Sequence, residues 1–318
     1  MPNLMLTNFC NYKCSYCFGK DIMFPKNPRL TMTRDTFNGI VDWVKRGPSD
    51  RVFHLMGGEP TLHPEIDYFV ERLLEEDMFI RVFSNLATPG AVALAEKVAH
   101  LPVSWVVNVN DPAHWNDVQR KNITAALELL KDKASLTFNI LPDEDDNLWA
   151  LDYTRKYHLN NSIKVGFLLP TYKQNNVALN DDEYTVVAAK VTRLAQEAAK
   201  YDIHLDYECG IPTCAFTDEQ LGILWRCGSH LHSGCQSRLD ITPDGQVIYC
   251  LPMATLGSKH FSEFPSYHEA SMWFENRWAP YRKLGRRIEC ATCNLNSGAA
   301  CHTGCLAKNL IGSKNINL

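Results

Sequence analysis

The chain has 318 residues, of which 45% are hydrophobic, and a formal net charge of −4. This length allows one large α/β domain and a smaller second one, and the slight acidity argues against a surface built for nucleic acid. The N-terminus lacks a basic stretch followed by a long apolar run, and no stretch approaches the roughly 20 apolar residues that span a bilayer. We therefore expect a cytoplasmic protein with no membrane or nucleic-acid partner.

Twelve cysteines are many for a chain without an export signal, because a reducing cytosol disfavours structural disulfides. Three lie within the first 17 residues, none lies between Cys17 and Cys209, and nine lie in the last 110 residues. This distribution favours metal or cluster ligation at the two ends of the chain.

From Leu4 to about Tyr201, short β-branched runs alternate with segments of helical periodicity, as in a parallel sheet with crossover helices. Helices with clear apolar stripes are predicted over about 33–47, around 66–74 and over about 181–201. The six predicted strands span residues 4–7, 52–56, 80–84, 103–109, 136–140 and 163–169. Six β/α units predict a partial, TIM-like (β/α)6 barrel and not a closed eight-fold one.

After Leu205 the sequence changes to short segments rich in Gly, Pro and Cys. We place a domain boundary near residue 204, with a core domain over 1–204 and a small cysteine-rich α+β domain over 205–318. A β-hairpin is predicted in the second domain, because residues 239–242 and 246–249 flank a Pro-Asp-Gly turn.

The N-terminal cysteines, Cys10, Cys14 and Cys17, have the spacing CxxxCxxC directly after the first predicted strand. Three thiolates bind three irons of a [4Fe–4S] cluster and leave the fourth iron open to another ligand. The alternative is a structural zinc site, which needs a fourth ligand and usually two CxxC pairs. The spacing favours the cluster.

This motif resembles the signature of the radical S-adenosylmethionine (SAM) superfamily, CxxxCxΦC with Φ aromatic, and Tyr16 stands at Φ. The resemblance implies that Cys10, Cys14 and Cys17 are catalytic: SAM would bind the open iron and be cleaved to methionine and a 5′-deoxyadenosyl radical. Tyr16 would lie beside the adenine. A reducing partner such as flavodoxin or ferredoxin would supply the electron.

A second mark of the superfamily, GGEP, follows the second predicted strand as Gly57, Gly58, Glu59 and Pro60. Two glycines let the backbone approach a ligand closely, and Glu59 can accept from the ammonium group of SAM. The resemblance implies further SAM contacts where the third and fourth strands end, with ordinary strand-end capping as the alternative. The residues there are Ser84, Asn85, Asn108 and Asn110. On the sixth strand, Val165, Gly166 and Leu168 either pack against the adenine or belong to the core.

The C-terminal cysteines resemble the SPASM extension of radical SAM peptide and protein maturases. Cys235, Gly245 and Cys250 match its first half, Cx9–15Gx4C; the second half departs, with seven residues in place of five before Cys301 and no cysteine after Cys305. The resemblance implies one or two auxiliary [4Fe–4S] clusters. The first would be bound by Cys227, Cys235, Cys250 and Cys305, and the second by Cys290, Cys293 and Cys301.

The fourth ligand of the second auxiliary cluster is left open, with Cys209, Cys214, a carboxylate or His302 as candidates. The alternative to a second cluster is a zinc site at Cys290, Cys293, Cys301 and Cys305. Candidates for proton or substrate contacts near the domain junction are Tyr172, Tyr207 and Glu208, with a structural role as the alternative for each.

These resemblances predict a radical SAM oxidoreductase that abstracts hydrogen from a ribosomal peptide or protein, with oxidative cross-linking or a related outcome. Formylglycine formation is not expected, because Leu251 stands where sulfatase-maturing relatives carry a basic Asp. With the first strand at residue 4, a separate leader-peptide-binding protein or the C-terminal domain would recognise the substrate. The alternatives are a SPASM-like enzyme acting on a small metabolite such as an amino acid or sugar derivative, and a non-catalytic iron–sulfur electron-transfer or zinc-binding protein.

Overall fold

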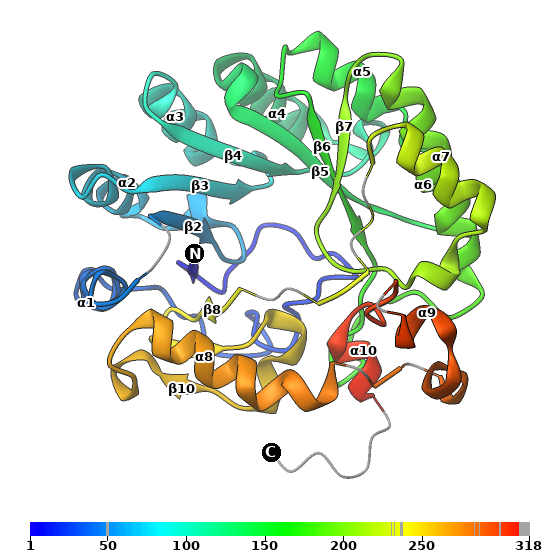
Figure 1. The fold of residues 1–318 in the computed structure, drawn as a ribbon. Coiled ribbons are helices and arrows are strands. Elements are labelled where there is room, and N and C mark those ends of the chain that lie inside the picture. The colour runs from blue at the N-terminus through cyan, green and yellow to red at the C-terminus, as the bar shows by residue number, and fades with distance from the viewer. Residues whose placement is uncertain are drawn as a thin grey trace.

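The computed structural model describes residues 1–48, 51–229, 231, 233–235, 238–282, 284–285, 287–298 and 300–311. Within these residues, ten strands form one sheet in the order β10-β9-β8-β1-β2-β3-β4-β5-β6-β7 (Figure 1). The strands are β1 (Asn3–Met5), β2 (Val52–Met56), β3 (Phe79–Ser84), β4 (Val103–Asn108), β5 (Ala134–Ile140), β6 (Ser162–Phe167), β7 (His204–Tyr207), β8 (Asp240–Ile241), β9 (Gln246–Ile248) and β10 (Lys259–His260).

Helices alternate with the parallel strands, as the periodicity predicts, and pack outside the curved sheet (Figure 1). Thr33 is the N-cap of the first of them, since its side chain accepts from the Thr36 N–H, and the helix buries Phe37, Ile40 and Val41 against the sheet. The helices of this part are α1 (Arg34–Lys45), α2 (Ile66–Glu75), α3 (Pro89–Val98), α4 (Asp117–Leu130), α5 (Trp149–Lys156) and α6 (Glu183–Ala199).

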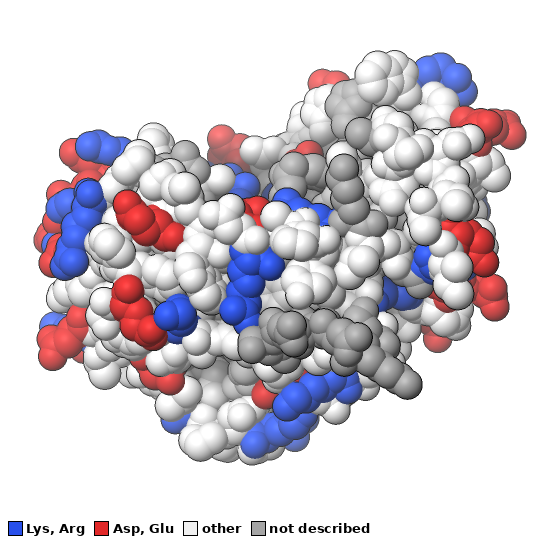
Figure 2. All heavy atoms as spheres, turned by 60° about the horizontal axis from the view of Figure 1, so that its bottom comes forward, with Lys and Arg blue, Asp and Glu red and all other residues white. Residues whose placement is uncertain are grey.

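Within the described residues, the C-terminal part carries four further helices (Figure 1). They are α7 (Asp218–Arg226), α8 (Tyr267–Trp278), α9 (Asn294–Ser297) and α10 (Leu306–Leu310). No helix in the described ranges has the length and apolar character needed to cross a membrane. On the face shown in Figure 2, positive and negative side chains are interspersed, in keeping with the small net charge.

The six predicted strands are confirmed, and the partial barrel is open, since β7 and β10 stand at the two edges of the described sheet. β7 is a seventh parallel strand that the sequence pattern does not predict. It pairs with β6 in the register Ser162↔His204. Its alternation is short, with only Leu205 and Tyr207 buried, so it offers little of the apolar signal that marks the other strands.

The predicted hairpin is confirmed, because β8 and β9 pair antiparallel around Gly245, whose φ of +81° suits glycine. β8 also pairs parallel with β1, and the Asn3 side chain donates to Asp240 Oδ1 at 2.6 Å. The hairpin therefore extends the barrel sheet across β1. The domain boundary near residue 204 stays a prediction, and it falls at the start of β7.

Candidate active site

The loop that carries the N-terminal cysteines is bound to the GGEP segment through the backbone. Gly58 N–H donates to the Thr7 carbonyl at 2.7 Å, and Glu59 N–H donates to the Phe9 carbonyl at 2.9 Å. A Cβ on Gly58 would stand 2.2 Å from the Phe9 oxygen, and one on Gly57 would stand 2.5 Å from the Thr7 oxygen. The close approach predicted for a ligand is thus made here by the chain's own cysteine loop.

Cys10, Cys14 and Cys17 are half-buried on the loop after β1. The pKa of the Cys10 thiol is raised to about 12, mainly by burial and also by the charges of Glu59, Cys14 and Cys17, against a lowering hydrogen bond from the Tyr12 N–H. The three sulfurs are therefore close enough to oppose one another's ionisation. They can all be thiolates only beside a compensating positive charge, which cluster iron supplies.

Among the residues with described positions, no three His, Cys, Asp or Glu side chains converge closely enough to hold a single metal ion. A [4Fe–4S] cluster does not need the thiolates to converge on one ion, because each thiolate binds a different iron. The half-buried, mutually repelling thiols of the N-terminal loop fit that requirement.

Glu59 lies at the centre of a polar network, with its residue only 1% exposed. Its Oε1 accepts from the Thr61 N–H at 3.2 Å, the Thr61 hydroxyl at 2.6 Å and the Ser84 hydroxyl at 2.7 Å, and its Oε2 accepts from the Asn85 N–H at 2.8 Å. Burial raises the pKa of Glu59, and these hydrogen bonds lower it. Oε2 retains a free lone pair, so an ammonium group can bind there and favour the ionised form.

Asn85 joins this network to the cysteine loop. Its Nδ2 donates to Asn11 Oδ1 at 2.8 Å and lies 4.0 Å from Cys10 Sγ. The structure thus brings together the predicted residues Glu59, Ser84 and Asn85, with Thr61 as a partner that the motif does not reveal. Pro60, buried, opens the short 3-10 helix η1 (Pro60–Leu62) that carries Thr61.

Tyr16 and Asn110, each predicted as a SAM contact, are hydrogen-bonded to each other: the Tyr16 hydroxyl donates to Asn110 Oδ1 at 2.6 Å. Gly166 packs beneath the same region, since a Cβ on it would stand 2.5 Å from Asn139 Oδ1. Asn108 is exposed at the end of β4. A hollow beside the pair is lined by Tyr16, Asn110, Asp111, His114, Phe138, Asn139, Leu141, Glu144 and Asn147.

Other candidates near the barrel interior divide between core and site. Val165 and Leu168 are buried in the hydrophobic core. Tyr207 stacks on Phe167 within the barrel wall, and burial raises its pKa to about 12. Glu208 has exposed surface, its pKa is raised by burial, and it hydrogen-bonds Thr137.

The Tyr172 N–H donates to the Pro252 carbonyl at 2.8 Å, and this hydrogen bond joins the loop after β6 to the C-terminal part.

The loop after β6 also hydrogen-bonds to the cysteine loop, and we call these contacts the clamp. Asn176 Nδ2 donates to the carbonyls of Tyr16 at 3.1 Å and Leu169 at 2.8 Å, and the Val177 N–H donates to the Ser15 carbonyl at 3.0 Å. No pattern in the sequence marks Asn176 for this role. It fixes the backbone of the residue at the aromatic position of the motif.

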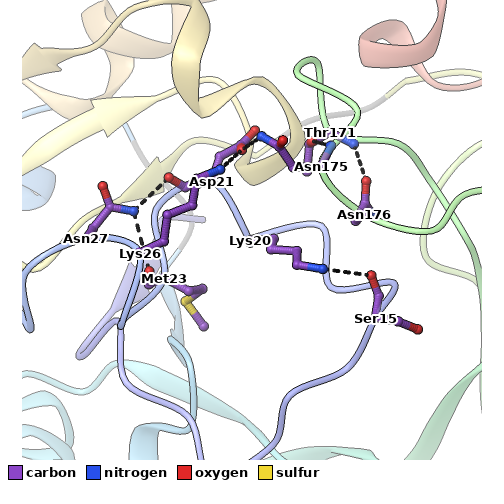
Figure 3. A network of polar contacts seen from close by, with 9 residues as sticks. All are labelled: Ser15, Lys20, Asp21, Met23, Lys26, Asn27, Thr171, Asn175 and Asn176. Atoms are coloured by element: carbon purple, nitrogen blue, oxygen red, sulfur yellow. Dashed lines mark hydrogen bonds and ion pairs between the residues drawn. The ribbon is translucent and has the colours of Figure 1, made fainter.

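A second set of contacts continues the clamp beyond Cys17, as Figure 3 shows. Asn175 Nδ2 donates to Asp21 Oδ1, and Lys26 pairs with the same carboxylate at 3.2 Å. Lys20 Nζ reaches the Ser15 carbonyl at 3.5 Å across the loop. The cysteine loop is therefore held from two sides, by the GGEP segment and by the loop after β6.

Residues 4–113 match the family profile described as the Radical SAM superfamily. These residues form a radical SAM domain. Enzymes of this superfamily use a [4Fe–4S] cluster and SAM. A stretch of 64 residues is 36% identical to a GTP 3′,8-cyclase of Microcystis aeruginosa (strain NIES-843 / IAM M-2473) and covers 20% of each protein.

The radical SAM domain and its C-terminal extension together resemble solved structures along nearly the whole chain. Streptococcus suis SuiB bound to precursor peptide SuiA has a TM-score of 0.69 at 14% identity, over 99% of this chain and 73% of that one. The structure of anSMEcpe with bound AdoMet has a TM-score of 0.68 at 15% identity, over 96% of this chain and 85% of that one. At such identities the likeness is one of fold.

Beyond the radical SAM domain, three of the predicted cluster ligands come together. Burial raises the pKa of the Cys250 thiol, and the neighbouring Cys235 and Cys305 add to it. The pKa of Cys305 is raised to about 12 by burial and by Cys235. Cys227 ends α7, and its charge raises the pKa of Tyr207. Cys305 is thus grouped with the first predicted set of ligands.

The second predicted set, Cys290, Cys293 and Cys301, lies within one short stretch of the chain. The Cys293 N–H donates to the Cys290 carbonyl at 3.4 Å, and the Cys301 N–H returns to the Leu295 carbonyl at 2.9 Å. The Thr213 hydroxyl donates to the Ala300 carbonyl at 2.8 Å, so the segment bearing Cys214 lies beside Cys301. His302 packs instead on Gly234, where a Cβ would stand 2.9 Å from the His302 Cβ.

Proposed function

We propose that the chain is a radical SAM enzyme that abstracts hydrogen from a peptide, with a cross-link or a related oxidative modification as the product. When bound, the [4Fe–4S] cluster and SAM supply a 5′-deoxyadenosyl radical for that abstraction. The observation that carries the proposal is the joining of the cysteine loop, the GGEP segment and the end of β3 in one hydrogen-bonded network.

In this proposal Cys10, Cys14 and Cys17 hold the cluster. The remaining lone pair of Glu59 Oε2 accepts from the ammonium group of SAM, while the hydrogen bonds from Ser84 and Asn85 keep the carboxylate in place. A carboxylate fixed in this way binds the cofactor without having to reorganise.

The adenine is proposed to lie in the hollow beside Tyr16 and Asn110, the pair joined at 2.6 Å. Tyr16 offers a ring to pack against, and the amide of Asn139, which also lines the hollow, offers polar contacts. Asn108, at the exposed end of β4, faces solvent near the same strand ends and is proposed as a further contact to the cofactor.

The peptide substrate is supported by the structures of similar fold. SuiB was solved with its precursor peptide SuiA, and anSMEcpe was solved with AdoMet and the Cp18Cys peptide. The C-terminal cysteines support an oxidative outcome, since one or two auxiliary [4Fe–4S] clusters there would carry away the electron left on a substrate radical. A flavodoxin or ferredoxin is proposed as reductant, with a separate leader-binding protein as a further partner, in the cytoplasm.

Formylglycine remains outside the proposal. Leu251 carries no proton acceptor, and the nearby carboxylate of Asp240 accepts from the Asn3 side chain at 2.6 Å and the Leu251 N–H at 2.8 Å. Both of its oxygens are thus already engaged in holding the hairpin to β1.

The test is isotope transfer. Reconstituted protein is incubated under anaerobic conditions with SAM, dithionite and deuterated candidate peptides, taken from short reading frames beside its gene. We expect deuterium in 5′-deoxyadenosine and a peptide lighter by two hydrogens. Transfer from deuterated amino acids or sugar derivatives, with none from any peptide, would contradict the peptide substrate and support the metabolite alternative.

A further inference from the structure

Four C-terminal cysteines stand next to glycines, in the pairs Cys209-Gly210, Cys227-Gly228, Gly234-Cys235 and Gly304-Cys305. Three of these glycines, Gly210, Gly234 and Gly304, lie in contact with one another. A Cβ on Gly210 would stand 2.7 Å from the Gly234 oxygen and 2.9 Å from its nitrogen, and one on Gly304 would stand 3.4 Å from the Gly210 oxygen. Backbone segments from distant parts of the chain therefore touch where only a hydrogen side chain fits.

A hydrogen bond locks this meeting point. The Gly304 N–H donates to the Ser233 carbonyl at 2.8 Å, directly beside Gly234. Gly304 has a φ of +76°, a conformation that favours glycine. The contact thus fixes the backbone next to Cys209, Cys235 and Cys305.

These contacts bring the backbones of Cys209, Cys235 and Cys305 together, and Cys250 directly follows Tyr249, whose hydroxyl lies 3.9 Å from Cys235 Sγ. Cys209 keeps exposed surface even though the surrounding protein is dense. Four cysteines from four separate segments, after β7, before β8, after β9 and before α10, therefore lie around one region. That is the number of thiolates that completes a [4Fe–4S] cluster.

The surroundings of this region suit an anionic cluster. Arg282 donates to the Cys235 carbonyl at 3.2 Å and to the Tyr249 hydroxyl at 2.8 Å, and that hydroxyl lies 3.9 Å from Cys235 Sγ. A guanidinium beside thiolates favours their ionised form. The donors around a cluster's sulfurs also set its potential.

Cys227, which the family pattern puts in the upstream ligand position, has a different environment. It closes α7, where its N–H donates to the Ile223 carbonyl at 3.0 Å, and a Cβ on the next residue, Gly228, would lie 4.0 Å from His204.

We infer that Cys209, and not Cys227, is the fourth thiolate ligand of the first auxiliary cluster, with Cys235, Cys250 and Cys305. The inference rests on the proposed function for the presence of that cluster. The inference adds to the proposed function one ligand, Cys209, from the loop directly after β7, which the family spacing does not indicate.

The experiment counts iron in a background without the N-terminal cluster, so SAM chemistry has no part in the readout. The Cys10, Cys14 and Cys17→Ala protein is reconstituted anaerobically, with and without Cys209→Ala or Cys227→Ala. We expect Cys209→Ala to lose about four irons per chain and Cys227→Ala to lose none. The reverse result, equal losses, or no loss in either variant would overturn the inference. If the wild-type protein did not cleave SAM, the proposed function would be contradicted. The iron count that tests Cys209 would be unaffected.

Two further measurements guard against a variant that merely misfolds. In the wild-type reconstituted protein, Cys209 should resist iodoacetamide while Cys227 is alkylated, as read by peptide mass spectrometry; protection of Cys227 with labelling of Cys209 contradicts the inference. Gly210→Ala keeps every thiol but should also lose about four irons. Gly222→Ala is the matched control, because its Cβ would meet only the flexible end of Arg226 at 3.4 Å, and it should keep its iron.

Discussion

The two cysteine-bearing regions are built in different ways. The N-terminal cysteines share one loop, which hydrogen bonds from the GGEP segment and from Asn176 hold against the ends of the strands. Among the C-terminal cysteines, Cys209, Cys235 and Cys305 come from segments far apart in the chain, which meet at glycine contacts such as that between Gly210 and Gly234. The N-terminal site therefore depends on the position of one loop, whereas the C-terminal region depends on how several separate segments pack together.

The largest effect should come from Gly58→Ala, which attacks the local site. Its Cβ would stand 2.2 Å from the Phe9 carbonyl oxygen, so the cysteine loop must move. A displacement of about 1 Å at reacting groups can lower a rate by about 100-fold, and we expect such a loss in 5′-deoxyadenosine formation. Gly222→Ala, in α7, should keep its activity. Equal rates in both variants would show that the loop does not depend on this contact.

Glu59→Gln should have the next largest effect, on cofactor affinity. The amide lacks the negative charge for the ammonium group, and its NH2 would face hydroxyl or N–H donors now bound to the carboxylate. Loss of a charged hydrogen bond costs about 1.5–3 kcal/mol, so SAM should bind about 10- to 100-fold more weakly. Equilibrium binding measures this, with the exposed Glu263→Gln as control. Unchanged affinity would remove Glu59 from the cofactor site.

A smaller effect is expected from Asn176→Ala, which opens the clamp over the cysteine loop. Two carbonyls, of Tyr16 and Leu169, lose their donor, at a cost of about 1–3 kcal/mol. We expect SAM cleavage to fall several-fold with iron content unchanged. The exposed Asn276→Ala is the matched control. A loss of iron along with activity would mean that the clamp holds the cluster itself and not its orientation.

The smallest effect is expected on the pH dependence of the free energy of unfolding, through Asp240 in the hairpin of β8 and β9. Burial raises the pKa of Asp240 to about 7, so the folded chain keeps this proton at pH values where the unfolded chain has released it. The free energy of unfolding should therefore fall as pH rises from about 4 to about 7, and Asp240→Asn should flatten that part of the profile. Urea unfolding at several pH values, on both reconstituted proteins, compares the slopes. Parallel slopes would contradict a raised pKa.

The sequence predicts the local parts of the molecule well. CxxxCxxC and GGEP lie on consecutive β/α units, and the ends of parallel strands meet at one edge, so the contact of Glu59 with Ser84 and Asn85 follows from topology. β7 is missed because its two buried residues alternate with His204 and Asp206. Nothing in a single sequence brings Asn176 to the cysteine loop or Gly210 to Gly234, because those contacts depend on how distant segments pack.

The central claim is that the loop of Cys10, Cys14 and Cys17 holds a cluster that cleaves SAM. The most direct test is 5′-deoxyadenosine formation from SAM and dithionite by the anaerobically reconstituted protein, beside iron analysis. The wild type should form it, and the Cys10, Cys14 and Cys17→Ala variant should form none while holding about four irons fewer per chain. Equal product from both proteins, or none from an iron-replete wild type, would contradict the claim.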